Sequence, residues 1–133
     1  TEHLFASIIY FNAGALEQLI SSGIDIRLIS PLGDDAMSAA ANARNVEAVR
    51  RLHALGLDVD QAPAGGKRPI FFALAAESEM YKETGEWNPD EVLCSDCLIE
   101  LGADLGLRGN ETETPLDYAR RWEHPKYSLK GGS

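Results

Sequence analysis

Gly56-Leu57-Asp58 marks the end of one structural unit in this chain of 133 residues, because the same Gly-x-Asp pattern stands at Gly23-Ile24-Asp25 and at Gly102-Ala103-Asp104. The three glycines lie 33 and then 46 residues apart. A period near 33 residues is typical of proteins built from stacked repeats, in which each unit packs on its neighbours. The second step exceeds the first by 13 residues, which predicts an insertion of that length in the third unit.

The register divides the chain into four units of a single domain. Pro69 and Pro115 are also 46 residues apart, so the insertion lies between Pro69 and Gly102. Terminal units are usually atypical because they have only one neighbour. We expect an N-terminal capping repeat at 1–29, a full repeat at 30–62, a repeat at 63–108 with an insertion near 77–88, and a truncated C-terminal capping repeat with a tail at 109–133.

Each unit is expected to contain two helices joined by a turn. In the second unit, Ala36–Ala41 predicts a first short helix and Arg44-Asn45 a turn. Val46 then begins a run of apolar residues at every third position, which is the spacing of a buried helical stripe. In the third unit the first helix is expected to start at Ile70 and to continue into the insertion until Thr84-Gly85 ends it.

A new helix start is encoded after the insertion. Asn88-Pro89-Asp90-Glu91 offers a capping side chain, a proline for the first helical position and two acids that suit the first turn. We therefore expect the second helix of the third unit to run from about Pro89 to Leu101.

Thr114-Pro115-Leu116-Asp117-Tyr118-Ala119 resembles the first helix of an ankyrin repeat, whose pattern reads T-P-L-H-x-A and is followed by G-A-D, as at Gly102-Ala103-Asp104. Asp35-Ala36-Met37-Ser38 and Arg68-Pro69-Ile70-Phe71 depart from this pattern in the second and third units but keep its spacing. The chain thus resembles the ankyrin-repeat family over nearly its whole length. The resemblance implies an all-α ankyrin-repeat solenoid of about four helix-turn-helix units with an insertion in the third.

The chain is acidic, and the charge is unevenly distributed. Its net charge is −9, and eleven of the 21 acidic residues lie between Glu77 and Glu113, where two basic residues accompany them. We expect this stretch to form a solvated acidic face, which repels phosphate backbones and argues against nucleic acid as a partner. No apolar run approaches the roughly 18 residues that span a bilayer. We expect a soluble, cytoplasmic protein with no membrane partner.

Cys94 and Cys97 form the one motif-like pair for metal or redox chemistry. A zinc site needs two further ligands, and His3, His53 and His124 show no matching spacing. A redox pair usually stands at the start of a helix after a strand, whereas these cysteines fall inside the predicted helix. We interpret them as buried thiols and expect no metal, no cofactor and no enzymatic activity. A small Cys-based redox or metal protein is the remote alternative.

Two surfaces are candidates for binding another protein, and the first is implied by the resemblance. In ankyrin repeats the turn tips and the exposed side of the first helices form a concave binding surface. The corresponding candidate residues are Tyr10, Asp34, Asn42, Lys67, Glu111, Glu113, Arg121 and Trp122. The alternative for Trp122 is that it covers the open end of the stack.

The insertion is the second candidate surface. Met80, Tyr81 and Trp87 stand among acids there, with Glu83 and Glu86 nearest, which is the composition of an apolar contact ringed by charge. Such a surface favours a partner with a basic face. The alternative is that Tyr81 and Trp87 fold back on the flank of the repeats.

Small size, acidity and the lack of a recognisable catalytic motif favour a dedicated binder or inhibitor of one partner protein. Short ankyrin proteins of this kind resemble bacterial immunity proteins that neutralise a cognate toxin. This resemblance implies a toxin or effector enzyme with a basic surface as the partner, because opposite charges speed association. A scaffold or adaptor that recruits an enzyme without inhibiting it is the alternative function.

Overall fold

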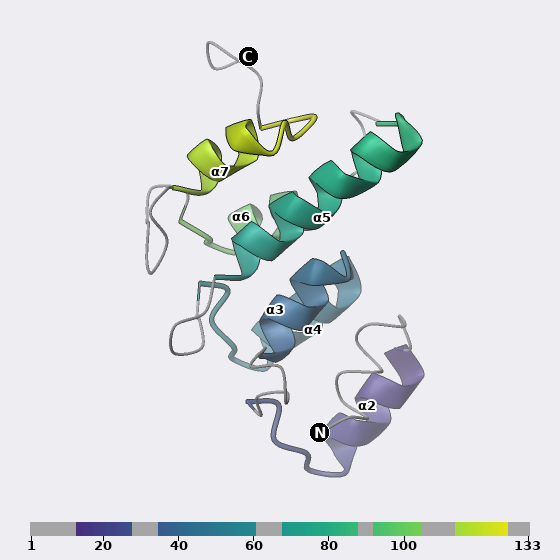
Figure 1. Ribbon diagram of the computed structural model, residues 1–133. Helices are drawn as coiled ribbons and strands as arrows, with labels where there is room; N and C mark the ends of the chain where they lie inside the picture. Colours follow the sequence, from purple (N-terminus) through teal and green to yellow (C-terminus); the bar gives the residue numbers. More distant parts are fainter. Residues whose placement is uncertain (1–12, 28–34, 61–67, 88–91, 105–113, 128–133) are drawn as a thin grey trace.

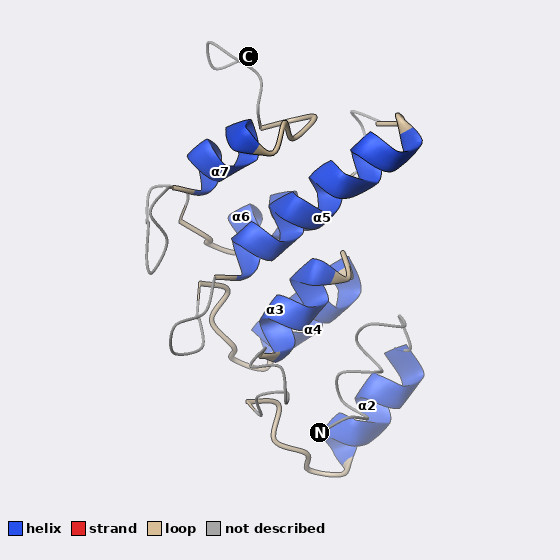
Figure 2. Ribbon diagram, in the orientation of Figure 1, coloured by secondary structure: helices blue, strands red, loops and turns tan. Residues whose placement is uncertain are grey.

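Helices and turns make up the part of the chain that the computed structural model describes, which is residues 13–27, 35–60, 68–87, 92–104 and 114–127. No strand is present in these ranges, as Figure 2 shows. The helices are α2 (Ala13–Ser21), α3 (Ala36–Asn42), α4 (Val46–Ala54), α5 (Pro69–Thr84), α6 (Cys94–Glu100) and α7 (Pro115–Arg121). The prediction of an all-α structure is confirmed for these residues.

The helices repeat in the register of the Gly-x-Asp pattern. α2 and α4 begin 33 residues apart, as do α3 and α5, whereas α5 and α7 begin 46 residues apart. α3 and α4 are therefore the first and second helices of the second unit, and α5 and α6 are those of the third. α2 is the second helix of the first unit, and α7 is the first helix of the fourth.

The first helices form one layer and the second helices another. α5 packs against both α3 and α7, α4 packs against α6, and the pairs α3–α4 and α5–α6 hold each unit together (Figure 1). At the other end of the stack, Glu17 on α2 accepts hydrogen bonds from Nε and Nη2 of Arg51 on α4, at 2.7 and 2.9 Å. Each helix pair buries an apolar face against its neighbour, as stacked repeats require.

The glycine of the Gly-x-Asp pattern ends the second helix of each unit. Gly23, Gly56 and Gly102 have φ angles of 89°, 100° and 114°, a left-handed conformation that favours glycine because it has no Cβ. The amide that follows each glycine bonds back into the last helical turn, as from Leu57 N to Leu52 O at 3.1 Å. This arrangement is a Schellman cap.

The aspartate of the pattern shapes the turn that comes next. Asp25 Oδ1 accepts the amide of Arg27 at 2.9 Å, and Asp58 Oδ1 accepts the amide of Asp60 at 2.8 Å. A side chain that bonds to the backbone two residues on forms an Asx turn. The tripeptide is therefore a helix stop followed by a turn signal, which explains why it repeats.

The first helices of the second and fourth units begin at a side-chain cap. Asp35 Oδ1 accepts the Ser38 amide at 3.0 Å, and Thr114 Oγ1 accepts the Asp117 amide at 3.2 Å. Pro115, at the first helical position, needs no acceptor for an amide proton. Asp35 thus does in the second unit what Thr114 does in the fourth, so the departure from the ankyrin pattern keeps the cap.

α5 departs from the common helix length. It has 16 residues against 7 in α3 and 7 in α7, and nine extra residues lengthen a helix by about 13 Å. α5 ends where the sequence predicts, at Thr84-Gly85, with Gly85 at a φ of 69° and its amide 2.7 Å from Tyr81 O. Figure 1 shows α5 projecting past α3 and α7. We call residues 77–87 the overhang.

The start of α6 differs from the prediction. The helix begins at Cys94 and not near Pro89, since Val92 and Leu93 lie outside it. Residues 88–91, which carry the local start signal, fall outside the described ranges. The predicted helix was therefore too long at this end.

Acceptors from side chains explain why α6 starts at this point. The Ser95 amide donates to Glu77 Oε2 of α5 at 2.9 Å, and the Leu93 amide donates to Asp96 Oδ2 at 3.1 Å. The first amides of a helix lack partners within the helix and need such acceptors. The carboxylate of another helix fixes the start here, and the local sequence does not reveal it.

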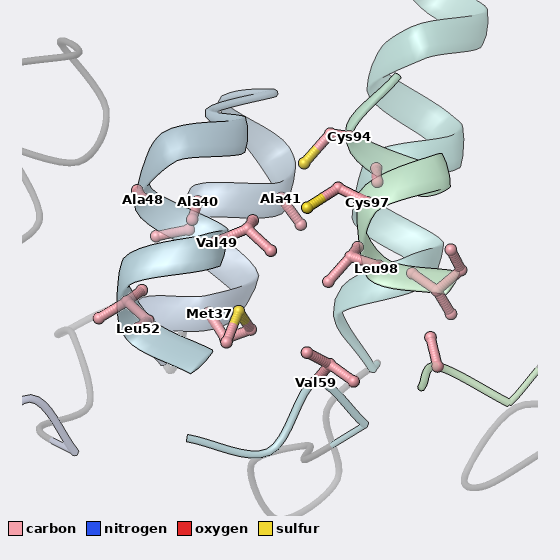
Figure 3. Packing of buried hydrophobic residues seen from close by; sticks show 14 of the residues in the cluster. Met37, Ala40, Ala41, Ala48, Val49, Leu52, Val59, Cys94, Cys97 and Leu98 are labelled. Atoms are coloured by element: carbon pink, nitrogen blue, oxygen red, sulfur yellow. The ribbon is translucent and has the colours of Figure 1, made fainter. Parts of the chain in front are cut away.

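The core runs through both layers and is rich in small residues. Ala40, Ala41, Ala73 and Ala119 are each 0% exposed, which lets neighbouring helices approach closely. Larger side chains fill the remaining space, among them Met37, Leu52, Phe71, Leu74 and Leu98. Figure 3 shows part of this packing, with Met37, Val49 and Leu52 on α3 and α4 and Leu98 on α6.

Candidate functional site

One buried carboxylate ties the overhang to the stack. Glu77, which the sequence places in a solvated acidic face, is only 6% exposed. Its Oε1 accepts Ser95 Oγ at 2.6 Å and lies 2.8 Å from His124 Nε2, and its Oε2 accepts the Ser95 amide. The prediction of a solvated residue is wrong at Glu77, because donors from α6 and from the turn after α7 converge on its carboxylate. We call Glu77, Ser95 and His124 the hub.

The histidine of the hub is held in one tautomer. His124 Nδ1 accepts the amides of Lys126 at 3.0 Å and of Tyr127 at 3.1 Å. A ring nitrogen that accepts hydrogen bonds carries no proton, so the proton lies on Nε2 and is donated to Glu77. The imidazole therefore acts as a bridge from the backbone of the last turn to the carboxylate on α5.

The hub has the arrangement of a structural network. Ser95 and His124 are both 0% exposed, and each bonds to Glu77. These bonds join α5, α6 and the turn after α7 at one buried point. The sequence offered no signal for the hub, because Glu77 and His124 are separated by 47 residues and each looks like an ordinary polar residue.

A second carboxylate extends the attachment of the C-terminal turn. Asp96 on α6 accepts hydrogen bonds from Lys126 Nζ at 2.8 Å, from the Tyr127 hydroxyl and from the Leu93 amide. Burial alone raises the pKa of Asp96, but the bonds from Lys126, Tyr127 and Leu93 outweigh it and hold the pKa below its ordinary value. Burial, followed by the bond to Asp96, raises the pKa of Tyr127.

A cavity of about 150 Å³ lies against the overhang. Met80, Tyr81 and Trp87 line it from the overhang, Val46 from the start of α4, and Pro125 from the turn after α7. Tyr81 and Trp87 are half-buried. They fold back toward the repeats and still leave part of their surface open, so the insertion both covers the stack and shapes a recess. We call this recess the overhang cavity.

The exposed apolar surface of the described residues gathers at the overhang cavity. Met80 is 39% exposed and Val92 is 58% exposed, and they are the two large hydrophobic residues exposed in the described ranges. Both line the cavity. Exposed apolar residues that cluster around a recess mark an interaction site more strongly than single exposed residues do.

The charges at the overhang cavity are mostly acidic. Glu77 and Glu86 line it together with one cation, Arg44, and Glu79 and Glu83 are exposed elsewhere on the overhang. Arg44 lies in the turn between α3 and α4 with a φ of 57°, a left-handed conformation that is strained for a residue with a Cβ. The recess thus has apolar walls and a largely acidic surround.

The two cysteines are buried thiols in the first turn of α6. Cys94 is 2% and Cys97 is 0% exposed, and neither forms a disulfide. Burial, then the charge of Glu77, raises the pKa of Cys94, and burial likewise raises the pKa of Cys97. Figure 3 shows both sulfur atoms pointing from α6 toward α3 and α4, near Ala41. Thiols in such surroundings are poor nucleophiles at neutral pH.

The end of α7 is the part of the predicted concave surface that the structure describes best. Trp122 is half-buried, its ring lies 5.8 Å from that of Tyr118, and its Nε1 is buried without a hydrogen-bond partner in the described ranges. Lys82 Nζ and Arg121 Cζ lie 5.7 and 6.0 Å from the centre of the Trp122 ring. Most of the indole therefore packs on α7 and under two cations.

The structure brings together only some of the predicted binding residues. Met80, Tyr81, Glu86 and Trp87 line the overhang cavity, and Glu83 is exposed beside them. Asn42 is exposed at the end of α3, and Arg121 is exposed at the end of α7. The remaining predicted residues lie outside the described ranges: Tyr10, Asp34, Lys67, Glu111 and Glu113. Sequence reasoning missed Arg44, Val46, Val92 and Pro125 as lining residues, because they reach the cavity only through the fold.

Comparison with known proteins identifies the fold. No family profile and no curated protein matches the chain, whereas 305 chains of solved structures match it. One of them is the ankyrin-repeat domain of human ASB11, with a TM-score of 0.70 and 21% sequence identity over 93% of this chain. The match covers 50% of that chain, so the present chain spans half its length. The predicted ankyrin-repeat fold is confirmed.

The described residues also bear on membranes and metals. Among the helices placed in these ranges, none is both long and apolar enough to cross a membrane. Within the same ranges, His, Cys, Asp and Glu side chains do not gather in groups of three or more that could hold a metal ion.

Proposed function

We propose that this chain is a protein-binding ankyrin-repeat module that docks one partner protein with a basic surface. The observation that carries the proposal is the meeting of Met80 and Val92, the two exposed large hydrophobics of the described ranges, at one recess with an acidic surround. Protein interfaces commonly combine an apolar centre with a polar rim. The ankyrin-repeat fold supports the same role by supplying a rigid stack on which such a surface can be held.

A binding role fits the chemistry of the described residues better than catalysis does. The hub and the two thiols are the groups from which a reaction might be built, and all of them are buried. The hydrogen bonds of the hub and the raised pKa of the Cys94 thiol suit structural residues. We therefore propose that the chain acts by contact alone and needs no cofactor.

Within this role we propose a dedicated inhibitor of the kind implied by the resemblance to bacterial immunity proteins. The net charge of −9 and the exposed acids Glu79, Glu83 and Glu86 on the overhang support a partner whose functional surface is basic, such as a toxin or another effector enzyme. Opposite charges raise the association rate and disfavour wrong partners. A scaffold or adaptor is the alternative, and it differs in one respect: the activity of the partner persists in the complex.

The overhang is the first choice for the contact surface, and the end of α7 is the second. The α7 surface has an argument of its own, because Arg121 is exposed and lies 5.1 Å from the ring of Tyr118 and 6.0 Å from that of Trp122. Trp122, however, already packs on Tyr118, whereas Met80 and Val92 leave a large part of their surface in solvent.

Co-purification from the native host tests the proposed function. The tagged chain should recover one protein in stoichiometric amount, and the amount should fall as salt is raised, since exposed charges are screened over about 10 Å at 0.1 M salt. Trp87→Ala and the double variant Glu83→Lys/Glu86→Lys should lose the partner, while Trp122→Ala should keep it. Normal recovery with all three variants would exclude both surfaces.

A further inference from the structure

We propose that the overhang cavity is an anchor pocket for a single large apolar side chain, presented by a basic segment of the partner protein. This inference rests on the proposed function and adds the chemistry of the bound segment. It is carried by three observations: the size of the cavity, the exposed apolar residues at it, and the charges around it.

The size of the cavity selects a side chain over a small-molecule ligand. Pockets for cofactors and drug-sized ligands span about 300 to 1,000 Å³, and this one has a volume of about 150 Å³. An apolar cavity of about 150 Å³ in another protein is known to accept benzene. A cavity of this volume therefore suits one phenylalanine, leucine or methionine side chain.

The lining of the cavity supports an apolar occupant that arrives from solvent. Met80 and Val92 are exposed at 39% and 58%, and Trp87 is half-buried. Methionine and tryptophan adapt well to apolar guests, because a thioether is flexible and an indole offers a large flat surface. Cys94 also lines the cavity and is 2% exposed, so a buried residue already stands on its inner side.

Charge complementarity selects a basic segment to carry the side chain. Glu86 lines the cavity and is exposed, and Glu79 and Glu83 are exposed on the same overhang. Lys82, the one cation of the overhang, has its Nζ 5.7 Å from the Trp122 ring. Arg44 is the remaining cation among the lining residues, and the acids outnumber it. A lysine or arginine on either side of the apolar residue could pair with the exposed carboxylates of the overhang, Glu79, Glu83 and Glu86.

The cavity lies between the hub and the preceding unit. The hub fixes the overhang on the side of α6 and the last turn, through the contacts of Glu77 with Ser95 and His124. Val46 lies at the first position of α4 in the preceding unit, so the cavity spans the junction between the two units. Glu77 belongs to both the hub and the lining of the cavity, so the hub fixes one wall of the recess.

Nuclear magnetic resonance with methyl-labelled methionine tests this proposal directly. The chain has two methionines, so Met80 reports on the pocket and Met37, which is 0% exposed, serves as an internal control. The probes are three five-residue peptides: phenylalanine between two pairs of lysines, alanine between two pairs of lysines, and phenylalanine between two pairs of glutamates.

The phenylalanine–lysine peptide should shift the Met80 signal, leave Met37 in place and bind about tenfold more tightly than the alanine–lysine peptide. The phenylalanine–glutamate peptide should bind more weakly and lose less affinity when salt is added. Val46→Phe, which fills the pocket, should bring the two lysine peptides to equal affinity. Ala54→Phe places the same side chain at an exposed position of α4 and should change neither affinity. Val92→Trp is a second filling variant, should Val46→Phe fail to fold.

Several outcomes would overturn the proposal. Equal affinity of the two lysine peptides would mean that charge alone drives binding and that no apolar side chain is anchored. An unchanged Met80 signal would mean that the peptide binds elsewhere. A Met80 shift that grows with protein concentration in the absence of peptide would make a second copy of the chain the occupant. An equal shift with free indole would point to small apolar ligands. If the peptides show no preference but a native partner is still captured, only the anchor-pocket proposal is wrong. If the peptides show the preference but no native partner is captured, the proposed function is wrong.

Discussion

α3 and α5 hold the same place in successive units, yet α3 stops after 7 residues and α5 continues for 16. α3 ends at Asn42, and a tight turn leads directly into α4 at Val46. α5 runs past the stack, and Glu77 in its middle binds α6 and the turn after α7. The comparison shows that an insertion into a repeat can serve two purposes. Its first residues are absorbed into the core, and its later residues form a new surface.

The largest effect on stability is expected from removing the carboxylate that holds the overhang. Glu77→Ala leaves the Ser95 amide, the Ser95 hydroxyl and His124 Nε2 without their acceptor. A buried donor that loses its acceptor costs about 1 to 3 kcal/mol, so we expect the loss of this shared acceptor to lower the free energy of unfolding by about 3 kcal/mol or more.

Urea denaturation measures this loss, and Glu79→Ala is the matched control. Glu79 lies two residues along on the same helix and is exposed, so its removal should change stability by less than about 0.5 kcal/mol. Equal effects of the two substitutions would mean that the hub does not hold the overhang.

A smaller effect is expected at Asp96, and it depends on pH. Because the pKa of Asp96 is lowered in the folded protein, its ionised form stabilises the fold above the ordinary carboxyl pKa. This contribution is lost as the pH falls through the lowered value. Asp96→Asn should therefore cost about 1 kcal/mol at pH 7 and show a shallower loss of stability between about pH 4 and pH 2.

Thermal melts at several pH values check the sign of the Asp96 effect. The wild-type and Asp96→Asn melting temperatures should converge toward low pH, where Asp96 is protonated in both the folded and unfolded chain. Curves that stay parallel down to pH 2 would show that the bonds to Lys126, Tyr127 and Leu93 do not favour the ionised carboxylate.

The smallest change in stability is expected from substitutions at the residues that follow α3 and α5. The chain after α3 passes through Arg44 at a φ of 57°, and α5 ends at Gly85 with a φ of 69°. Arg44→Gly relieves left-handed strain and should raise the free energy of unfolding by about 0.5 to 1 kcal/mol, whereas Gly85→Ala should lower it by a similar amount.

Paired calorimetric melts of these two variants provide the check, and one of them also bears on the pocket. Among the described residues, Arg44 is the one cation that lines the overhang cavity, so Arg44→Gly should bind the phenylalanine–lysine peptide more tightly than the wild-type chain does. A destabilised Arg44→Gly variant would show that its guanidinium contributes more than the backbone strain costs.

Much of the fold was readable from the sequence because its signals are local and repeat. The left-handed glycines, the Asx turns at Asp25 and Asp58, and the cap at Thr114 are each formed within a few residues. The end of α5 at Thr84-Gly85 belongs to the same class. Such features depend on backbone conformation and short-range hydrogen bonds, which the sequence states directly.

The start of α6 and the hub were not readable, for a physical reason. The amide of Ser95 takes its acceptor from Glu77, 18 residues earlier, and His124 reaches the same carboxylate from 47 residues later. In sequence, Glu77 is one acid in an acidic run. Its burial follows from the stacking of three elements, and a local sequence pattern does not reveal contacts between residues so far apart in the chain.

The candidate site could be predicted from the sequence only in part. The composition of the insertion pointed to Met80, Tyr81 and Trp87, and the structure places all three at one cavity. The other wall, with Arg44 and Val46, comes from the preceding unit and could be found only in the fold. The prediction with the largest consequence for function is that the partner binds the overhang and not the end of α7.

The affinity of the co-purified partner for Trp87→Ala and for Arg121→Ala, measured side by side by titration calorimetry, tests that prediction most directly. Truncation of an aromatic anchor at a protein interface often costs about 2 kcal/mol or more, which is roughly a thirtyfold loss of affinity. The account predicts a loss of that size for Trp87→Ala and less than about a twofold change for Arg121→Ala. A large loss for Arg121→Ala with unchanged binding by Trp87→Ala would contradict it and assign the interface to α7.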